Sequence, residues 1–502
     1  MTRFVAHRRQ FVIAPRPEAQ HDRFVHHDLA CGLILSHCPD LPVVRATTKD
    51  GREAWLLGHA IATERDAPSP AETLAMTGDA GLADVLWSWS GRWALLWGDR
   101  LYPDAGAMLG LHYRVEDGVV TVASSPAYFL DRDPADRLNT YEPQFGAPIL
   151  PGTAIAGVRK VLPSYSLSLR DGTLEPLPIA PPTKTDSAGH IDAFAELLGN
   201  ALVDVGRQQG RINLGLSAGY DSRVLLALAA ARGVEVTCTT FIKEANILAR
   251  PGAPLPSFPW RHDREVPHRL AEAVGLPHQY VTPGPLDLAT LREFDRHTGG
   301  GFADNERYYM AHGHVAALDN PVFLKGHGTE VAGANYLRFL PWSAGMSPQE
   351  FAGKVLPFLV NSGGVSERML REWLAMEARA GVYGADADFK ELFHVEQKRA
   401  GWLSNVYQGS DFGYDCLALS AGRKIFRALM SIPVAERQGY AVHRAVIARH
   451  APALLDLPFN VKSDPTEKLR HLAYQVRLLN LSLPQKLKWK VAAYKNRGLH
   501  AH

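Results

Sequence analysis

The sequence has few cysteines and no long apolar run. Its four cysteines, Cys31, Cys38, Cys238 and Cys416, are scattered through 502 residues, and none has the spacing of a zinc site. They are too few for a disulfide framework, so we expect a protein of a reducing compartment, the cytoplasm. No stretch is long and apolar enough to span a bilayer, and the first twenty residues lack the apolar core of a signal peptide. We therefore expect no membrane partner.

The chain also lacks an excess of charge of one sign. Its 54 Lys and Arg residues face 52 Asp and Glu residues, a formal net charge of +2. Only the segment from Lys462 to Arg497 is clearly basic, with Asp464 and Glu467 as its only acids. The favoured interpretation of this tail is a solvated helical face, with contact to nucleic acid or to an anionic substrate as the alternative. Nucleic acid is not an expected partner.

A chain of this length predicts at least two domains, and the pattern of predicted secondary structure changes near residue 190. Residues 1–177 read as short strands and turns, including a hairpin around Glu116-Asp117-Gly118. Residues 178–190 are rich in Pro, Ser and Thr and form the expected linker. From 191 to 502 strand patterns alternate with helix patterns, which predicts an α/β domain with a doubly wound parallel sheet.

A six-residue break, Ser-Ala-Gly-Tyr-Asp-Ser at 217–222, follows the first strand of that second half and leads into a helix. In a parallel sheet such a loop lies at the carboxyl end of a strand, where ligands bind. Ala218 and Gly219 let backbone N–H groups approach a phosphate at the helix N-terminus, and Ser217 and Ser222 offer hydroxyls. Asp221 would repel phosphate unless it holds Mg²⁺. The alternative is a turn with a capping Asp or Ser.

This break resembles the pyrophosphate loop of the N-type ATP pyrophosphatases, Ser-Gly-Gly-X-Asp-Ser, with Ala218 in place of the first glycine. The resemblance implies that ATP is cleaved to AMP and pyrophosphate with Mg²⁺. A second stretch, PVFLKGHGTEVAGANYLR at 321–338, is similar to the asparagine-synthetase motif Ser-Gly-Glu-Gly-Ala-Asp-Glu-Leu-Phe-Gly-Gly-Tyr. It keeps Gly326, Gly328 and Tyr336, and Glu330 stands where the family has its second metal-binding aspartate. Glutamate has the same negative charge as the aspartate of the family but a longer side chain.

The run from Ile425 to Pro465 resembles the end of the same family, in which a Pro-X-X-X-Lys segment closes the site. On that resemblance Lys462 neutralises pyrophosphate and the charge developing at the α-phosphate. A solvated surface lysine is the alternative interpretation.

Residues 90–129 resemble the end of a class II glutamine amidotransferase domain, so the first half is expected to be an Ntn-like α+β sandwich. A working glutaminase of that class needs a cysteine directly after the initiator methionine, whereas this chain begins Met1-Thr2-Arg3. Its glutamine-binding motifs Arg-Gly-Pro-Asp and Asn-Gly-Glu are also missing. We therefore expect a degenerate glutaminase domain, and an attacking amine that belongs to a substrate.

The residue between the two glycines of the second loop is His327, which lies close to the reacting groups in the family. A histidine can accept the proton of an attacking amine near neutral pH, although it could equally cap the loop. The position of the family glutamate falls at Asp415, so we predict that Asp415 orients His327.

The resulting prediction is an asparagine-synthetase-like amide ligase of the β-lactam synthetase or lasso-peptide cyclase type. It would use ATP and Mg²⁺ to adenylate a small-molecule or peptide carboxylate, alone or with a partner biosynthetic protein. Asparagine synthesis from free ammonia and non-catalytic nucleotide binding are the alternatives, and a tRNA-modifying role would use the basic tail.

Overall fold

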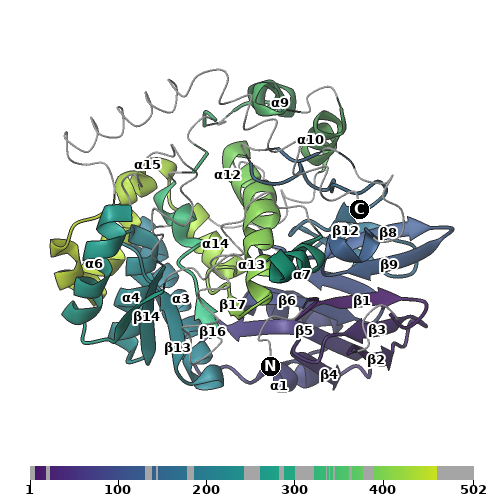
Figure 1. The fold of residues 1–502 in the computed structure, drawn as a ribbon, viewed down its shortest axis with the longest axis horizontal. Coiled ribbons are helices and arrows are strands. Elements are labelled where there is room, and N and C mark those ends of the chain that lie inside the picture. The colour runs from purple at the N-terminus through teal and green to yellow at the C-terminus, as the bar shows by residue number, and fades with distance from the viewer. Residues whose placement is uncertain are drawn as a thin grey trace.

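A computed structural model describes residues 6–18, 23–130, 138, 140–142, 145–177, 186–241, 260–281, 288–299, 322–334, 336–337, 340–342, 345–360, 364–376 and 388–460. Figure 1 shows a parallel sheet with helices on one side of the molecule and antiparallel strands on the other. Helices α12 (Phe389–Phe393) and α13 (Ser404–Asp411) lie between these two regions. The prediction of a mixed α/β protein with both kinds of sheet is confirmed.

The first half forms two six-stranded antiparallel sheets. One has the order β10-β8-β9-β1-β3-β2 and the other the order β12-β11-β7-β6-β5-β4. Their strands are β1 (Phe11–Ala14), β2 (Val25–Asp28), β3 (Ile34–His37), β4 (Val43–Thr47), β5 (Glu53–Ala62), β6 (Trp89–Trp97), β7 (Arg100–Pro103), β8 (His112–Glu116), β9 (Val119–Ala123), β10 (Arg159–Lys160), β11 (Tyr165–Ser168) and β12 (Leu174–Pro176). Helices α1 (Pro70–Met76) and α2 (Leu82–Ser88) lie between β5 and β6 in the chain.

The predicted hairpin joins β8 and β9. Glu116 pairs with Val119, which leaves Asp117 and Gly118 as a two-residue turn. Both have positive φ values, 50° and 76°. This is the conformation that a tight turn between right-twisted strands requires, and Asp-Gly adopts it at low cost.

The second half forms a five-stranded parallel sheet with the order β15-β14-β13-β16-β17. Its strands are β13 (Ile212–Gly215), β14 (Val236–Phe241), β15 (His278–Val281), β16 (Val322–Leu324) and β17 (Asp415–Leu417). The helices around it are α3 (Ser187–Gln209), α4 (Tyr220–Arg232), α6 (Trp260–Ala273), α14 (Arg423–Met430), α15 (Val434–Arg437) and α16 (Ala441–His450). Helix α7 (Leu288–Thr298) packs against α13. The inner strands read as apolar runs because helices cover both faces of such a sheet.

The hydrophobic cores do not divide at the predicted linker. Phe351 of α9 (Pro348–Val355), Trp373 of α10 (Val365–Ala375) and Phe393 are fully buried in the same cluster as the strands of the antiparallel sheets. Helices of the second half therefore complete the core of the first. Residues 178–185, most of the expected linker, lie outside the described residues.

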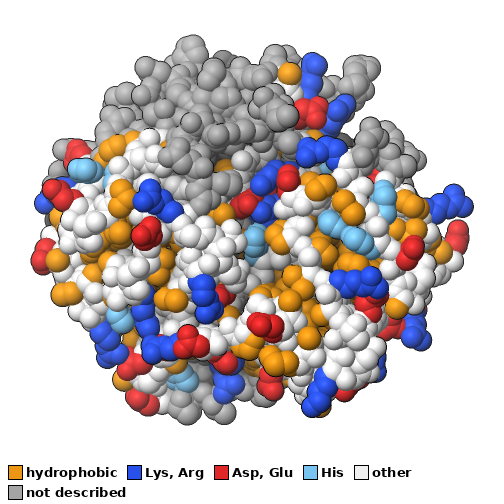
Figure 2. Space-filling view, turned by 90° about the horizontal axis from the view of Figure 1, so that it is seen from below, with side chains coloured by type: hydrophobic (Ala, Val, Ile, Leu, Met, Phe, Trp, Pro, Cys, Tyr) orange, Lys and Arg blue, Asp and Glu red, His pale blue; other side chains and the backbone are white. Residues whose placement is uncertain are grey.

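Among the described residues no helix is long and apolar enough to cross a membrane. On the face shown in Figure 2, basic and acidic side chains are interspersed rather than separated into regions of one sign.

Candidate functional site

The loop at 217–219 lies at the point where the strand order of the parallel sheet reverses. The chain leaves β13 through this loop into α4 and returns to β14 on one side, while β16 lies on the other side. Ligands of open parallel sheets bind at such a switch point, beyond the carboxyl ends of the strands. Gly219 is the N-cap of α4 and makes no side-chain capping bond, so the first N–H groups of the helix face this position without a side-chain partner.

Two serines hold the loop in shape. The backbone N–H of Ser217 donates to Oγ of Ser222 at 3.1 Å, and that hydroxyl donates to the carbonyl of Ser217 at 3.2 Å. The N–H of Gly219 donates to Oγ of Ser217 at 3.2 Å. Both hydroxyls and the N–H groups of Ser217 and Gly219 are therefore used inside the loop, and the N–H groups in the first turn of α4 are the better donors to an anion. Ala218 is fully buried.

The second glycine loop, between β16 and the short helix η4 (Thr329–Gly333), packs directly against the first. A Cβ added to Gly326 would lie 2.8 Å from the backbone nitrogen of Ser222, so only glycine permits this approach. Thr329 Oγ1 donates to Oδ1 of Asp221 at 2.6 Å. The structure thus brings Asp221, Ser222 and Gly326 together.

Glu330 is held within its own loop. One carboxylate oxygen accepts the N–H of Gly328, and the other lies 3.2 Å from Nε2 of His394. Burial works against ionisation of this side chain, but the charge of Arg399 and the bond from His394 outweigh it and place the pKa of Glu330 below its ordinary value. Glu330 is therefore an anion with both oxygens engaged.

The ring of His327 meets that of Trp402 edge-on, at 6.0 Å between centroids. Desolvation by the surrounding protein, followed by the charge of Lys325, lowers the pKa of His327 below 6.5. A neutral imidazole at pH 7 is able to accept a proton, as the proposed role needs.

The predicted pairing of His327 with Asp415 does not occur. Asp415 begins β17 opposite Val322, at the amino ends of the two strands, whereas His327 follows the carboxyl end of β16. The carboxylate of Asp415 instead forms ion pairs with Arg8 and Arg9 of the N-terminal segment. The sequence alignment gave the position of Asp415 along the chain but not the end of the strand on which it lies.

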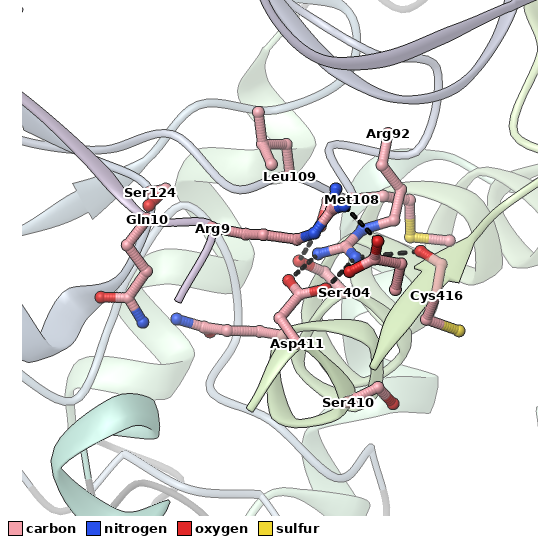
Figure 3. A network of polar contacts seen from close by, with 12 residues as sticks. Arg9, Gln10, Arg92, Met108, Leu109, Ser124, Ser404, Ser410, Asp411 and Cys416 are labelled. Carbon is pink, nitrogen blue, oxygen red and sulfur yellow. Dashed lines mark hydrogen bonds and ion pairs between the residues drawn. The ribbon is translucent and has the colours of Figure 1, made fainter. Parts of the chain in front are cut away.

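Through Arg9, Asp415 is linked to a buried polar region that joins the two halves. Figure 3 shows this region with Arg9, Arg92 and Asp411 labelled. Arg92 of β6 makes two hydrogen bonds to Asp411 of α13, at 2.8 and 2.7 Å, and a third to the carbonyl of Cys416 at 3.0 Å. In Figure 3 Arg9 and Arg92 both point toward Asp411. Removing one member would leave a buried charge unpaired, so this network fixes how the halves dock.

Lys462 lies outside the described residues, which end at Asn460. The N–H of Asn460 donates to the carbonyl of Ala218 at 3.1 Å, two residues before Lys462 in the chain. The fully buried Arg223 also binds the carbonyls of Ala218 and Pro458, at 3.2 and 2.7 Å. The described chain up to Asn460 is therefore anchored on the 217–219 loop.

Two histidines that the sequence did not single out contact the predicted carboxylates. His394 contacts Glu330, and Nε2 of His443 lies 3.0 Å from Oδ1 of Asp221. The contact between Asp221 and His443 spans 222 residues and that between Glu330 and His394 spans 64. No motif or local spacing could have indicated either one.

The donor set fits Mg²⁺ in part. Mg²⁺ is commonly held by one or two carboxylates together with phosphate oxygens and waters. Asp221 is 38% exposed at its side chain, and its Oδ2 makes no hydrogen bond to any described residue. Glu330 would reach an ion only after leaving its loop contacts. Within the described residues no group of three His, Cys, Asp or Glu side chains is arranged to hold a metal.

No protein-family model matches the chain, and no curated protein sequence matches it either. Among solved structures, the NMN synthetase from Francisella tularensis matches with a TM-score of 0.20 and 16% identity, over 40% of this chain and 81% of that one. The glutamine phosphoribosylpyrophosphate amidotransferase from B. subtilis, complexed with ADP and GMP, matches with a TM-score of 0.21 and 11% identity, over 72% and 89% of the two chains. At such TM-scores neither likeness carries an argument about the site.

Proposed function

We propose that the chain is an ATP-dependent amide ligase that adenylates a carboxylate and joins it to an amine. The observation that supports this most directly is the junction of the two glycine loops, where Thr329 donates to Asp221 at the N-terminus of α4. The N-terminus of a helix without a side-chain cap, a partly exposed carboxylate and a close second loop meet there. This combination suits a nucleoside triphosphate with its cation.

In the proposed reaction a substrate carboxylate attacks the α-phosphorus of ATP, and pyrophosphate departs. The backbone N–H groups in the first turn of α4, next to Ala218 and Gly219, bind its oxygens, with Lys462 as a further cation. Mg²⁺, when bound through Asp221 and with a role for Glu330, supplies positive charge against the phosphates. The amine then attacks the acyl-adenylate, His327 accepts its proton, and AMP leaves.

We propose that the amine belongs to a substrate, as in a tailoring or cyclising enzyme. The described residues just before β1 support this. Arg8 and Arg9 form ion pairs with Asp415 of the other half, so these side chains serve the contact between the two halves. Asparagine synthesis from aspartate and free ammonia is the alternative. It differs only in the carboxylate that is adenylated and in the amine that attacks it.

A second candidate function is nucleotide binding without turnover. The observation that favours it is Glu330, whose two oxygens are already occupied by Gly328 and His394. A site that cannot free this carboxylate would bind a nucleotide with one protein ligand to the cation and would not complete the reaction.

Exchange of labelled pyrophosphate into ATP distinguishes these functions. The protein is incubated with Mg²⁺, ATP and pools of carboxylic acids and peptides, with one arm containing aspartate and ammonia. We expect exchange with one acid, and we expect Asp221→Asn to abolish it. Exchange with aspartate would indicate the asparagine synthetase alternative. ATP binding without exchange in any pool would favour the non-catalytic function.

A further inference from the structure

The carboxylate of Asp221 is fixed through one of its two oxygens. Oδ1 accepts from Thr329 at 2.6 Å and from His443 at 3.0 Å, whereas Oδ2 has no hydrogen-bond partner among the described residues. An aspartate in the first turn of a helix commonly interacts with the helix's own N–H groups. Here donors from two other elements, η4 and α16, hold it instead.

His443 is built into the protein so that only one of its nitrogens meets a polar group. The residue is fully buried on α16, and its Nδ1 has no hydrogen-bond partner among the described residues. Because a carboxylate can only accept, Nε2 must carry the proton that is shared with Asp221. The tautomer is therefore set by the contact.

Packing fixes the imidazole plane. A Cβ added to Gly333 would lie 3.2 Å from Cε1 of His443, so the glycine makes room for the ring on one side. The ring of Tyr440 lies at 5.5 Å and that of Tyr220 at 5.9 Å on other sides. Tyr220 precedes Asp221 in the chain, so the same aromatic group orders both partners of the hydrogen bond.

We propose that His443 is a positioning residue that fixes Asp221 through Oδ1 and leaves Oδ2 to a divalent cation bound with the nucleotide. This inference rests on the proposed function, because it assigns a cation to Asp221. Ligands held by a second hydrogen-bonded residue bind metal more tightly, since their orientation is set before binding, and loss of such a partner typically lowers metal affinity by about 10- to 100-fold. A histidine that served only to fill the core would affect stability and leave the cation affinity unchanged.

The test measures binding of Mn²⁺ by electron paramagnetic resonance of the free ion, with α,β-methylene ATP present. His443→Leu keeps the apolar bulk but removes the donor. His443→Gln can place an amide N–H near the position of Nε2, whereas His443→Asn reaches only the position of Nδ1. His450→Leu is the matched control, because His450 lies on the same helix and its charged neighbours are Arg232, Arg449, Glu196 and Asp192 rather than Asp221.

We expect the Mn²⁺ dissociation constant to rise about 10- to 100-fold in His443→Leu and His443→Asn, and by less than about threefold in His443→Gln and His450→Leu. Equal affinity in His443→Leu and the unchanged protein would overturn the proposal. If His443→Leu does not fold, equal affinities in the Gln and Asn variants would overturn it in the same way. Asp221→Asn separates this failure from that of the proposed function: if its Mn²⁺ affinity is also unchanged, no cation binds at Asp221 at all.

Discussion

Gly328 combines two constraints that no other residue satisfies. Its φ of 108° lies in a region that side chains rarely adopt, and an added Cβ would lie 1.8 Å from Oγ of Ser420 and 2.7 Å from Nη2 of Arg399. Both neighbours belong to the site, since Ser420 donates to the carbonyl of His327 and Arg399 to that of Gly328. The glycine lets the loop close onto these groups.

Gly328→Ala is expected to displace this loop. The left-handed conformation alone costs about 1–2 kcal/mol, and overpacking adds about 1–3 kcal/mol. Gly345→Ala is the matched control, because Gly345 has a φ of 75° and no atom within 4 Å of an added Cβ. Chemical denaturation should show the larger loss of free energy of unfolding for Gly328→Ala. Equal losses would mean that Ser420 and Arg399 move aside freely.

At the scale of elements, the connection between α12 and α13 is a ten-residue π-helix, His394–Leu403, labelled η6. Such helices are rare and are often found at functional sites. Its residues face both halves of the molecule. His394 and Arg399 contact the second glycine loop, whereas Gln397 donates to the carbonyl of Leu150 at 2.9 Å and accepts its N–H at 2.7 Å.

Gln397→Leu is expected to lower the free energy of unfolding by about 2–4 kcal/mol, because it leaves the buried N–H and C=O of Leu150 without partners. Gln408→Leu on α13 is the matched control. Gln408 is similarly buried, but its amide nitrogen has no hydrogen-bond partner among the described residues, so we expect a change within about 1 kcal/mol. Chemical denaturation of both variants measures the difference. A similar loss in the control would assign the effect to general packing of the helix.

The elements themselves could be predicted because their signals are local. The apolar run before Ser217 and the helical spacing after it indicate β13 and α4, and Asp-Gly between alternating residues indicates the β8–β9 hairpin. The partners of the site residues could not be predicted. Asp221 meets His443 only because α16 packs against α4, and such docking depends on the whole core rather than on any short pattern.

At the scale of the whole molecule, two histidines are buried in the folded chain. His112 of β8 and His297 of α7 are 5% and 0% exposed. Burial, assisted by the charge of Lys160, lowers the pKa of His112 to about 3. Burial also lowers the pKa of His297 to about 4, although its bond to the carbonyl of Gln408 opposes this shift. The folded protein therefore keeps both imidazoles neutral in mild acid.

This neutrality predicts a loss of stability below about pH 6.5, the ordinary pKa of an exposed histidine. Above that pH both states carry neutral imidazoles and no linkage arises. As the pH falls through it, the unfolded chain binds protons that the folded chain excludes, so each histidine lowers the free energy of unfolding by about 1.4 kcal/mol per pH unit, down to its folded pKa. Urea denaturation from pH 7.5 to 4.5 measures the free energy of unfolding of the unchanged protein and of His112→Leu, each normalised at pH 7.5. Between pH 6 and 4.5, the free energy of unfolding of the variant should fall less steeply with pH, by about 1.4 kcal/mol per pH unit. Parallel curves for the variant and the unchanged protein would mean that His112 becomes protonated in the folded state.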